Sequence, residues 1–257
     1  MDTQQVMLEY NQFERQQFSA YGGQKVDTPE VVRYVSPEQY GSYIAYFSLT
    51  ADNAQAVIER EKAYFLHLGK CFEWKTYDTD LPVDIQQMLV SNGFEQGDKE
   101  SFMVLDLTSI TAKPVDESLI REVNDEQGIR DAIRVQEQVW GGSFDWQFQH
   151  LMTLKQQAPD ELAIYVVYHQ DQPVTSAWLT FNGESPFAGI WGGSTIESYR
   201  GRGFYSLLLN KRIAEAKARG KKYLIIDASD MSRPIVEKYG FQFITHTTGY
   251  EFDSSQR

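Results

Sequence analysis

The second half of the chain alternates between short apolar runs and amphipathic windows, and most of these segments end at glycine, proline or a polar turn. Runs rich in β-branched and aromatic residues predict strands, because such side chains pack well on a pleated, half-buried surface. Windows in which apolar residues recur at helical spacing predict helices. The predicted strands are 120–123, 162–168, 173–181, 187–196 and 222–229, and the predicted helices are 128–140, 146–157 and 206–219.

The first half of the chain contains the same kinds of segment. Strands are predicted at 31–35, 41–49, 71–77 and 101–107, and helices at 8–20, 54–68 and 82–90. The order strand, helix, strand, short helix, strand from 41 to 107 is repeated from 187 to 252. We therefore interpret the first half as a degenerate copy of part of the second. The polar stretch 108–114, which ends in proline, is the predicted linker between a domain at 1–110 and a domain at 115–257.

A glycine-rich turn joins the strand that ends at Ile196 to the helix that follows. The turn contains Arg200, Gly201, Arg202 and Gly203. Such a turn leaves the first N–H groups of the helix unpaired, and the helix dipole favours an anion beside them. The glycines let a ligand approach the main chain, and the arginines add positive charge. The sequence therefore predicts a cradle for phosphate or pyrophosphate, with a purely structural turn as the alternative.

Other phosphate-binding motifs do not fit this turn. The chain has no Gly-x-x-x-x-Gly-Lys-Ser/Thr, and the third glycine of a dinucleotide fingerprint is absent. The corresponding turn in the first half, residues 49–53, has neither arginine nor glycine and carries Asp52, which would repel a phosphate. We expect the first half to be structural, and to help wall an acceptor pocket or support packing.

The composition narrows the choice of partners. The net charge of −12 argues against nucleic acid or an anionic membrane and mildly favours a cationic small molecule, although solubility alone explains it equally well. Cys71 has no second cysteine to pair with, and the four histidines lack metal-ligand spacing. The first residues are polar, and no run reaches transmembrane length. We expect a cytoplasmic protein without metal, whose oligomeric state stays open between monomer and homodimer.

The stretch around this turn resembles the acetyl-CoA-binding motif of the GNAT superfamily of N-acetyltransferases, which reads Arg/Gln-x-x-Gly-x-Gly/Ala. Arg200, Gly203 and Tyr205 stand at its three defined positions, and Tyr205 departs from the usual glycine or alanine. The pair Gly240–Phe241, which follows the next strand and a short helix, also agrees with the family. The resemblance covers residues 115–252.

The resemblance implies a fold and a ligand. The fold is α/β (α+β): a mixed, mostly antiparallel GNAT-type sheet flanked by helices, with a partial repeat at the N-terminus. In the family the sheet is splayed between its fourth and fifth strands, and pantetheine lies in the splay. Acetyl-CoA is the implied acyl-donor substrate. The residues expected to bind it are Thr195, Ile196, Arg200, Gly201, Arg202, Gly203, Phe204, Tyr205 and Ser229.

Acetyl transfer from a thioester to an amine requires a neutral amine. A lysine-like amine, with a pKa of about 10.4, costs roughly 4–5 kcal/mol to deprotonate at pH 7. The pKa of an α-amine lies only about one unit above pH 7, so its deprotonation costs less. Glu197, after the cofactor strand, and Asp227, within an apolar strand, are the candidate catalytic bases. Each has a structural alternative, a solvated turn carboxylate for Glu197 and a buried cap of the next turn for Asp227.

The family's usual tyrosine, four residues before the glycine of the Gly–Phe pair, is replaced by Val236. A thiol with a pKa of about 8.5 leaves without an acid at a cost of at most about 2 kcal/mol, so catalysis is weakened but not prevented. We therefore expect an acetyl-CoA-dependent N-acetyltransferase that acts on a primary amine of a small molecule or peptide, by direct attack in a ternary complex. The alternatives are a catalytically silent CoA-binding or interaction module and a transferase of another acyl-CoA.

Overall fold

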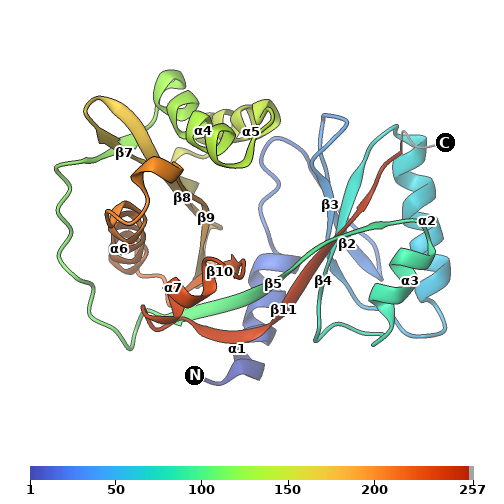
Figure 1. The fold of residues 1–257 in the computed structure, drawn as a ribbon. Helices are drawn as coiled ribbons and strands as arrows, with labels where there is room; N and C mark the ends of the chain where they lie inside the picture. Colours follow the sequence, from blue (N-terminus) through green and yellow to red (C-terminus); the bar gives the residue numbers. More distant parts are fainter. Residues whose placement is uncertain (255–257) are drawn as a thin grey trace. The chain divides into compact units, whose positions relative to one another are not determined.

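The computed structural model describes residues 1–254, and contacts within the chain divide it into two compact units. Unit 1 comprises Met1–Val104 and the chain from Asp227 onward, and unit 2 comprises Leu105–Ile226. Figure 1 follows the chain from the blue N-terminal helix to the red final strand. Each unit contains β-strands with helices packed on them, and most neighbouring strands are antiparallel. This is the mixed α+β architecture that the sequence predicted.

Unit 1 has the strand order β1-β2-β3-β4-β11-β5. These strands are β1 Gln24–Asp27, β2 Val31–Val35, β3 Ser42–Phe47, β4 Phe72–Tyr77, β5 Glu95–Asp106 and β11 Gln242–Phe252. The helices are α1 Thr3–Tyr10, the π-helix η1 Asn11–Gln16, α2 Ala54–His67, α3 Ile85–Ser91 and α7 Arg233–Glu237. β3 and β4 are parallel because α2 carries the chain back between them.

The last strand, β11, lies between β4 and β5, which are far upstream in the sequence. Thr247 pairs with Tyr77 of β4 and with Glu100 of β5, and Figure 1 shows the red strand beside the green ribbon of β5. Because of this pairing, the residues after Asp227 pack with the N-terminal strands. The compact units therefore differ from the expected ranges 1–110 and 115–257, and the division into two domains stays a prediction.

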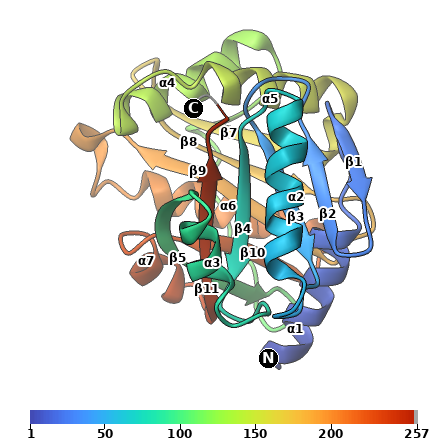
Figure 2. The same ribbon diagram turned by 90° about the vertical axis from the view of Figure 1, so that its right-hand side faces the viewer.

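Apolar side chains between one face of this sheet and the helices α2 and α3 form the core of unit 1. Figure 2 shows α2 in front of the strands of this sheet. Trp74 of β4 is fully buried, and its ring lies edge-on to those of Phe47 and Phe94, at 5.6 and 6.3 Å between centroids. Aromatic side chains bury more apolar area than other residues, so Trp74 is a large contributor to the stability of this unit.

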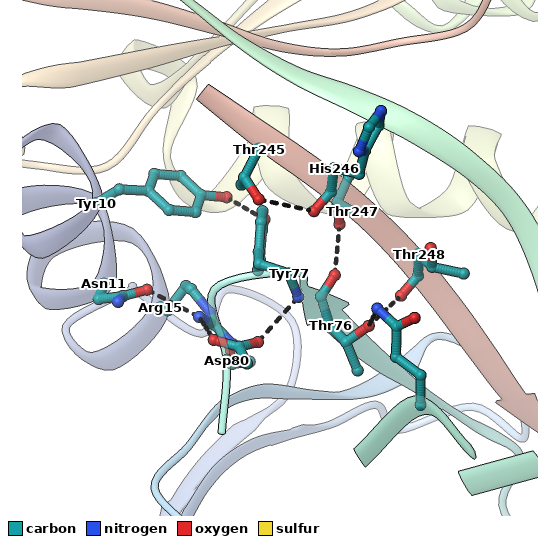
Figure 3. Close-up of polar contacts among 12 residues, drawn as sticks. Tyr10, Asn11, Arg15, Thr76, Tyr77, Asp80, Thr245, His246, Thr247 and Thr248 are labelled. Atoms are coloured by element: carbon teal, nitrogen blue, oxygen red, sulfur yellow. Dashed lines mark hydrogen bonds and ion pairs between the residues drawn. The ribbon is translucent and has the colours of Figure 1, made fainter. Parts of the chain in front are cut away.

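Polar contacts attach α1 and η1 to β4 and the loop after it (Figure 3). Arg15 forms an ion pair with Asp80 at 2.8 Å, and the two side chains are only 3% and 7% exposed. The hydroxyl groups of Tyr10 and Tyr77 lie 2.9 Å apart and form a hydrogen bond. A buried ion pair requires close geometry to offset desolvation, so these contacts fix where the N-terminal helices lie on unit 1.

Unit 2 has the strand order β10-β9-β8-β7-β6. These strands are β6 Ile120–Val123, β7 Leu162–His169, β8 Gln172–Phe181, β9 Phe187–Thr195 and β10 Tyr223–Ala228, whose last residues belong to unit 1. The helices are α4 Glu126–Trp140, α5 Asp145–Gln157, α6 Phe204–Ala218 and the 3₁₀ turns η2 Pro159–Glu161 and η3 Glu197–Tyr199. β9 and β10 are parallel and are joined by α6.

Local signals explain the helix and hairpin of unit 2. Asp125 caps α4 by accepting a hydrogen bond from the N–H of Gly128 at 2.8 Å, and Gly141 ends the helix at a φ of +75°. The β7–β8 hairpin turns at Gln170 and Asp171, whose φ values are +52° and +61°. A two-residue turn with positive φ at both positions matches the twist of the flanking strands.

The order β3–α2–β4–α3–β5 in unit 1 recurs as β9–α6–β10–α7–β11 later in the chain. In both copies the first two strands are parallel and a helix joins them. The predicted partial repeat at the N-terminus is therefore confirmed.

The structure differs from the sequence prediction mainly at element ends. The first helix starts at Thr3, where Asp2 caps it, rather than at residue 8. The helix expected from Pro82 starts at Ile85. β5 starts at Glu95 because pairing with β11 extends it over polar residues that give no apolar strand signal. The polar strand β1 was not predicted for the same reason.

Candidate functional site

In unit 2, β9 separates from β10 toward its C-terminal end. The two strands pair in parallel at Phe187, Ala188 and Gly189, whereas β9 continues beside β8 as far as Thr195. In the part of the chain that the structure describes, this end of β9 has no ladder to β10. Main-chain N–H and C=O groups at such an edge can bind a ligand. This arrangement agrees with the splay that the resemblance implied.

A β-bulge interrupts β9 where it runs beside β8. Ser194 pairs with Ser176 and Trp191 with Trp178, so β9 has one more residue than β8 between the two pairs. Gly192, within the bulge, has a φ of +58°, and a Cβ atom there would lie 2.0 Å from the Trp178 ring. Both the backbone conformation and the lack of space therefore require glycine at this position.

Gln136 of α4 holds this bulge through its side-chain amide. Its Nε2 donates to the carbonyl oxygen of Gly192 at 2.6 Å and to the hydroxyl of Ser176 at 2.8 Å. Its Oε1 accepts a hydrogen bond of 3.0 Å from the hydroxyl of Ser194, which also accepts one from the indole N–H of Trp140. We did not predict a role for Gln136, although a polar residue in the apolar stripe of an amphipathic helix is a signal that could have found it.

Main-chain and hydroxyl contacts anchor the end of β9. The N–H of Ile196 donates to the carbonyl oxygen of Val174 at 3.0 Å. The hydroxyl of Thr195 lies 3.1 Å from that of Thr175 and accepts its hydrogen bond. Both predicted strand-end residues, Thr195 and Ile196, are thus held in place at the start of the turn, before α6 begins.

Arg200 and Arg202 bring two exposed guanidinium groups to the turn. Arg200 Nε donates to the carbonyl oxygen of Thr195 at 3.2 Å, and Arg202 donates to that of Ser198 at 3.3 Å. The Arg202 guanidinium also lies 5.0 Å from the centroid of the Tyr199 ring. These contacts orient the arginines without neutralising them, because none involves a carboxylate.

The N-terminus of α6 is open to a ligand. Gly201 and Gly203 have φ values of +75° and +83°, and apart from the adjoining backbone no described atom lies within 4 Å of a Cβ placed at either. No side chain of the described residues caps α6, and its first turn holds no acidic residue. The first N–H groups, the helix dipole and the two arginines therefore favour an anion at this point. The residues present fit a phosphate group.

Phe204 and Tyr205, the first residues of α6, point toward the protein rather than away from it. Phe204 is buried, with its ring centroid 5.8 Å from that of His169. The Tyr205 ring packs on β9, where a Cβ at Gly193 would lie 2.9 Å from it. The tyrosine that replaces a small residue of the motif therefore fills space beside the bulge.

Arg212 lies on the buried face of α6 and is only 1% exposed. Its Nε donates to the carbonyl oxygen of Leu208 at 3.2 Å, and its Nη1 donates to that of Trp191 at 3.5 Å. Burial lowers the pKa of Arg212, and the nearby hydroxyl of Tyr205 opposes that shift. Arg212 thus connects α6 to β9 next to the bulge. A charged residue in the apolar stripe of α6 was the sequence signal for it.

Glu197, one of the two predicted bases, is the first residue of η3 and is exposed. Its carbonyl oxygen accepts a hydrogen bond of 3.1 Å from the N–H of Arg200. Unit 2 therefore brings Glu197 together with Thr195, Ile196 and the glycine turn along one short stretch of backbone.

Asp227 and Ser229 belong to unit 1. The side chain of Asp227 is 5% exposed and forms an ion pair with Lys75 of β4, so it does not cap the turn that follows. Ser229 makes that turn instead, because its carbonyl oxygen accepts the N–H of Arg233 at 2.9 Å. Val236, at the position of the family's usual tyrosine, is fully buried.

Residues 129–241 match the model of the family described as Acetyltransferase (GNAT) family. This segment belongs to the GNAT family. The GNAT segment, residues 129–241, begins in α4 and ends after α7, so it contains β9, the bulge, the glycine turn and α6. The resemblance inferred from the sequence is confirmed. None of the curated proteins compared matches the chain.

Solved structures with the same fold cover nearly the whole chain. A GCN5-related N-acetyltransferase from Kribbella flavida has a TM-score of 0.65 and 13% identity, covering 90% of this chain and 89% of its own. A functionally unknown conserved protein from Staphylococcus epidermidis has a TM-score of 0.65 and 14% identity, covering 95% of this chain and 97% of its own. A tandem GNAT protein from the clavulanic acid biosynthesis pathway has a TM-score of 0.61 and 8% identity, covering 96% of this chain and 87% of its own. Similarities at this level of identity show the fold.

Among residues 1–254, no helix combines the length and the apolar character needed to cross a membrane. The same residues contain no group of three histidine, cysteine, aspartate or glutamate side chains arranged to hold a metal ion.

Proposed function

We propose that this protein is an N-acetyltransferase that moves the acetyl group of acetyl-CoA to a primary amine of a small molecule or peptide. One observation carries the proposal: a segment of the GNAT family holds an uncapped helix N-terminus with two open glycines and two unneutralised arginines. The pyrophosphate of acetyl-CoA is the kind of anion that such a helix start binds.

In this proposal the turn grips the coenzyme through Arg200, Gly201, Arg202 and Gly203 and through the first N–H groups of α6, at Phe204 and Tyr205. The free edge of β9 near Thr195 and Ile196 supplies main-chain groups to pantetheine. Gln136 supports that edge because it fixes the bulge just before it. Ser229 stays a contact predicted from the sequence alone.

The proposed reaction is a direct attack in a ternary complex. The amine nitrogen bonds to the thioester carbonyl carbon, the C–S bond breaks, and CoA leaves as a thiolate that then takes up a proton. The amine must lose a proton to a base. Glu197 is the first candidate because it is exposed beside the turn. Asp227 is the second, because its side chain is only 5% exposed and is already engaged in an ion pair with Lys75.

The proposal requires no tyrosine acid at Val236. A thiol with a pKa of about 8.5 is a good leaving group, so a missing acid costs at most about 2 kcal/mol. Holding donor and acceptor together contributes more, about 7–11 kcal/mol. The rate enhancement would therefore come mainly from positioning.

The test is the release of free thiol from acetyl-CoA in the presence of polyamines, amino acids, aminoglycosides and peptides with free N-termini. We expect release with at least one amine. Replacing Arg200 and Arg202 together by alanine should abolish the rise in Tm that CoA causes. Arg134→Ala is the matched control, because Arg134 is an exposed arginine of the same unit on α4. An unchanged CoA-dependent rise in the double variant would contradict the proposal.

The buried Val236 favours a second candidate function, a catalytically silent CoA-binding module. CoA binding without thiol release across the whole amine panel would support it. Release with propionyl-CoA or succinyl-CoA, but not with acetyl-CoA, would identify a transferase of another acyl group.

A further inference from the structure

Arg212 of α6 carries a buried positive charge that no described carboxylate neutralises. The residue is 1% exposed, and no acidic side chain is among the groups that act on its charge. Nε and Nη1 donate to main-chain carbonyl oxygens, whereas Nη2 is buried and has no hydrogen-bond partner among the described residues. Removing an ion from water is unfavourable unless an opposite charge offsets it. The fold therefore keeps this charge at the expense of its own stability.

The two titratable groups that act on the charge of Arg212 are phenols. They are Tyr165 of β7 and Tyr205 of α6. Phenol hydroxyl groups are uncharged near pH 7. Burial raises the pKa of Tyr165, so this hydroxyl keeps its proton, and it is itself buried without a hydrogen-bond partner among the described residues. The protein therefore supplies no negative charge to this guanidinium, which leaves it available to a ligand.

Small residues on two strands let the guanidinium reach the sheet. Ser176 of β8 contacts Gln136 of α4, so the next residue, Ala177, projects from the opposite face of the sheet. Ala177 stands beside the bulge of β9, because the pairs on either side of it flank the bulge. In the bulge, a Cβ atom at Gly193 would lie 3.6 Å from Nη2 of Arg212. The positive charge is thus in contact with the backbone of β9.

The place where Arg212 meets β9 belongs to the free edge of that strand. The ladder between β9 and β10 ends at Gly189, among the residues that the structure describes, and Gly193 lies four residues further on. Gly193 is partly exposed and has no side chain. Only main-chain atoms of β9 therefore separate the guanidinium of Arg212 from a molecule bound at this edge.

The proposed function brings the sulfur of the coenzyme to this part of the strand. If the glycine turn binds the pyrophosphate, the pantetheine arm runs back along β9 from the turn, past Ile196 and Thr195. The sulfur is at the end of the arm that is farther from the pyrophosphate. Gly193 precedes Ile196 by three residues, which is about 10 Å along an extended strand. The bulge therefore lies on the side of the arm that carries the sulfur.

Acetyl transfer places a negative charge on that sulfur. As the amine nitrogen bonds to the carbonyl carbon, the electron pair of the C–S bond moves to the sulfur, and CoA leaves as a thiolate. Val236 has no proton to give to this thiolate. A fixed positive charge in a poorly solvated place stabilises a developing anion without any transfer of a proton.

We propose that the buried charge of Arg212 stabilises the thiolate of CoA at the free edge of β9. The inference rests on the proposed function and adds to it the group that assists the departure of CoA. Arg212 keeps its own proton, and the thiolate takes up a proton from solvent after it has left. Arg212 is a positioning residue, because it acts across the main chain of Gly193 and does not touch the coenzyme.

Titration of the thiol of CoA bound to the full chain tests this inference. The ultraviolet absorbance of the thiolate is followed against pH, and the same titration with desulfo-CoA, which lacks the thiol, corrects for protein groups. In the wild-type complex the thiol should titrate about one pH unit below that of free CoA, which is near 8.5.

Variants of α6 separate the charge of Arg212 from its shape. Arg212→Met removes the charge and should return the thiol to the pKa of free CoA. With an amine that supports thiol release, it should lower kcat roughly tenfold and leave the KM for acetyl-CoA unchanged. Arg212→Lys keeps the charge and should keep most of the shift. Lys211→Met is the matched control and should change neither quantity, because the charge of Lys211 is already paired with Glu117 at 2.8 Å.

A bound thiol that titrates like that of free CoA in the wild type would overturn the inference, and so would an unchanged shift in Arg212→Met. Both results would leave the binding of CoA and the proposed function intact. A chain that does not bind CoA would contradict the proposed function and this inference together. Arg212→Met should unfold at a Tm no lower than that of the wild type, because it loses an uncompensated buried charge. If it unfolds earlier, Arg212→Gln takes its place, since glutamine keeps a donor without the charge.

Discussion

The side-chain amide of Gln136 donates a 2.6 Å hydrogen bond to the carbonyl oxygen of Gly192, which attaches α4 to the bulge of β9. A carbonyl group inside a bulge does not accept a hydrogen bond from the neighbouring strand, so a side chain must donate one to it. The same amide group also contacts Ser176 and Ser194. One glutamine therefore sets the backbone shape of the strand that we propose to meet the coenzyme.

Gln136→Ala should lower the free energy of unfolding by about 3 kcal/mol, because it leaves several buried polar groups without partners. Acetyl transfer by the folded variant should fall as well, since the bulge loses its support. Urea denaturation measures the first effect and thiol release the second. Gln127→Ala changes an exposed glutamine of the same helix and should shift stability by no more than about 0.5 kcal/mol. Equal losses of stability and of thiol release in the two variants would show that Gln136 has no special role.

Gly192→Ala should destabilise unit 2 by more than about 3 kcal/mol. A positive φ alone costs a non-glycine residue about 1–2 kcal/mol, and here the new methyl group would also overlap the ring of Trp178. Gly183→Ala is the control, because Gly183 has a φ of +46° and, apart from its chain neighbours, no described atom within 4 Å of its Cβ position. It should show the backbone cost alone. Thermal unfolding of both variants separates the clash with Trp178 from the cost of the backbone conformation. Similar Tm values for the two variants would contradict the clash.

The pKa of Glu100 predicts a pH-dependent loss of stability. Its folded-state pKa is about 7, against an ordinary value of 4.5. Below pH 4.5 the carboxyl is protonated in both states, and between these values the unfolded chain releases the proton first, so stability falls as the pH rises. Glu100→Gln should therefore raise the free energy of unfolding by about 1 kcal/mol at pH 8, a value reduced for solvent screening. It should have little effect at pH 4.

Urea denaturation of wild type and Glu100→Gln at both pH values checks this prediction, because other titrating groups cancel in the difference. If the free energies of unfolding of the two proteins differ by the same amount at pH 4 and pH 8, the carboxyl of Glu100 keeps its ordinary pKa.

Tyr205→Ala restores a small residue at the last position of the motif. It should destabilise the protein by about 2 kcal/mol, because the ring that packs against Gly193 is lost. The CoA-dependent rise in Tm should remain, since the N–H groups and the arginines of the turn are unchanged. A thermal shift assay with and without CoA measures both quantities. Loss of the CoA effect would mean that the ring itself contacts the coenzyme.

The glycine turn and α6 could be predicted because their signals are local. Gly201, Gly203 and the helix-forming residues after them fix the turn within a few positions, and the expected ion pair between Glu215 and Arg219 is present at 2.8 Å. The strand-to-helix order also revealed the partial repeat, because periodicity survives when individual residues change.

Long-range partners could not be predicted in this way. Nothing in the residues of β11 indicates that it pairs with β4 and β5, because strand partners are chosen by tertiary packing. The ion pair of Asp227 with Lys75 depends on that same pairing. A polar residue in an apolar stripe marks Gln136 and Arg212 as buried, but it does not say which groups on β8 and β9 they contact.

The insertion of β11 between β4 and β5 has a consequence for biosynthesis. Until residues 242–252 leave the ribosome, β4 and β5 have no strand between them, and the N-terminal half exposes two open sheet edges. Such edges invite pairing with other nascent chains. This topology therefore predicts that a fragment lacking the last strand aggregates more readily than the full chain, since translation that stops before residue 242 leaves both edges open.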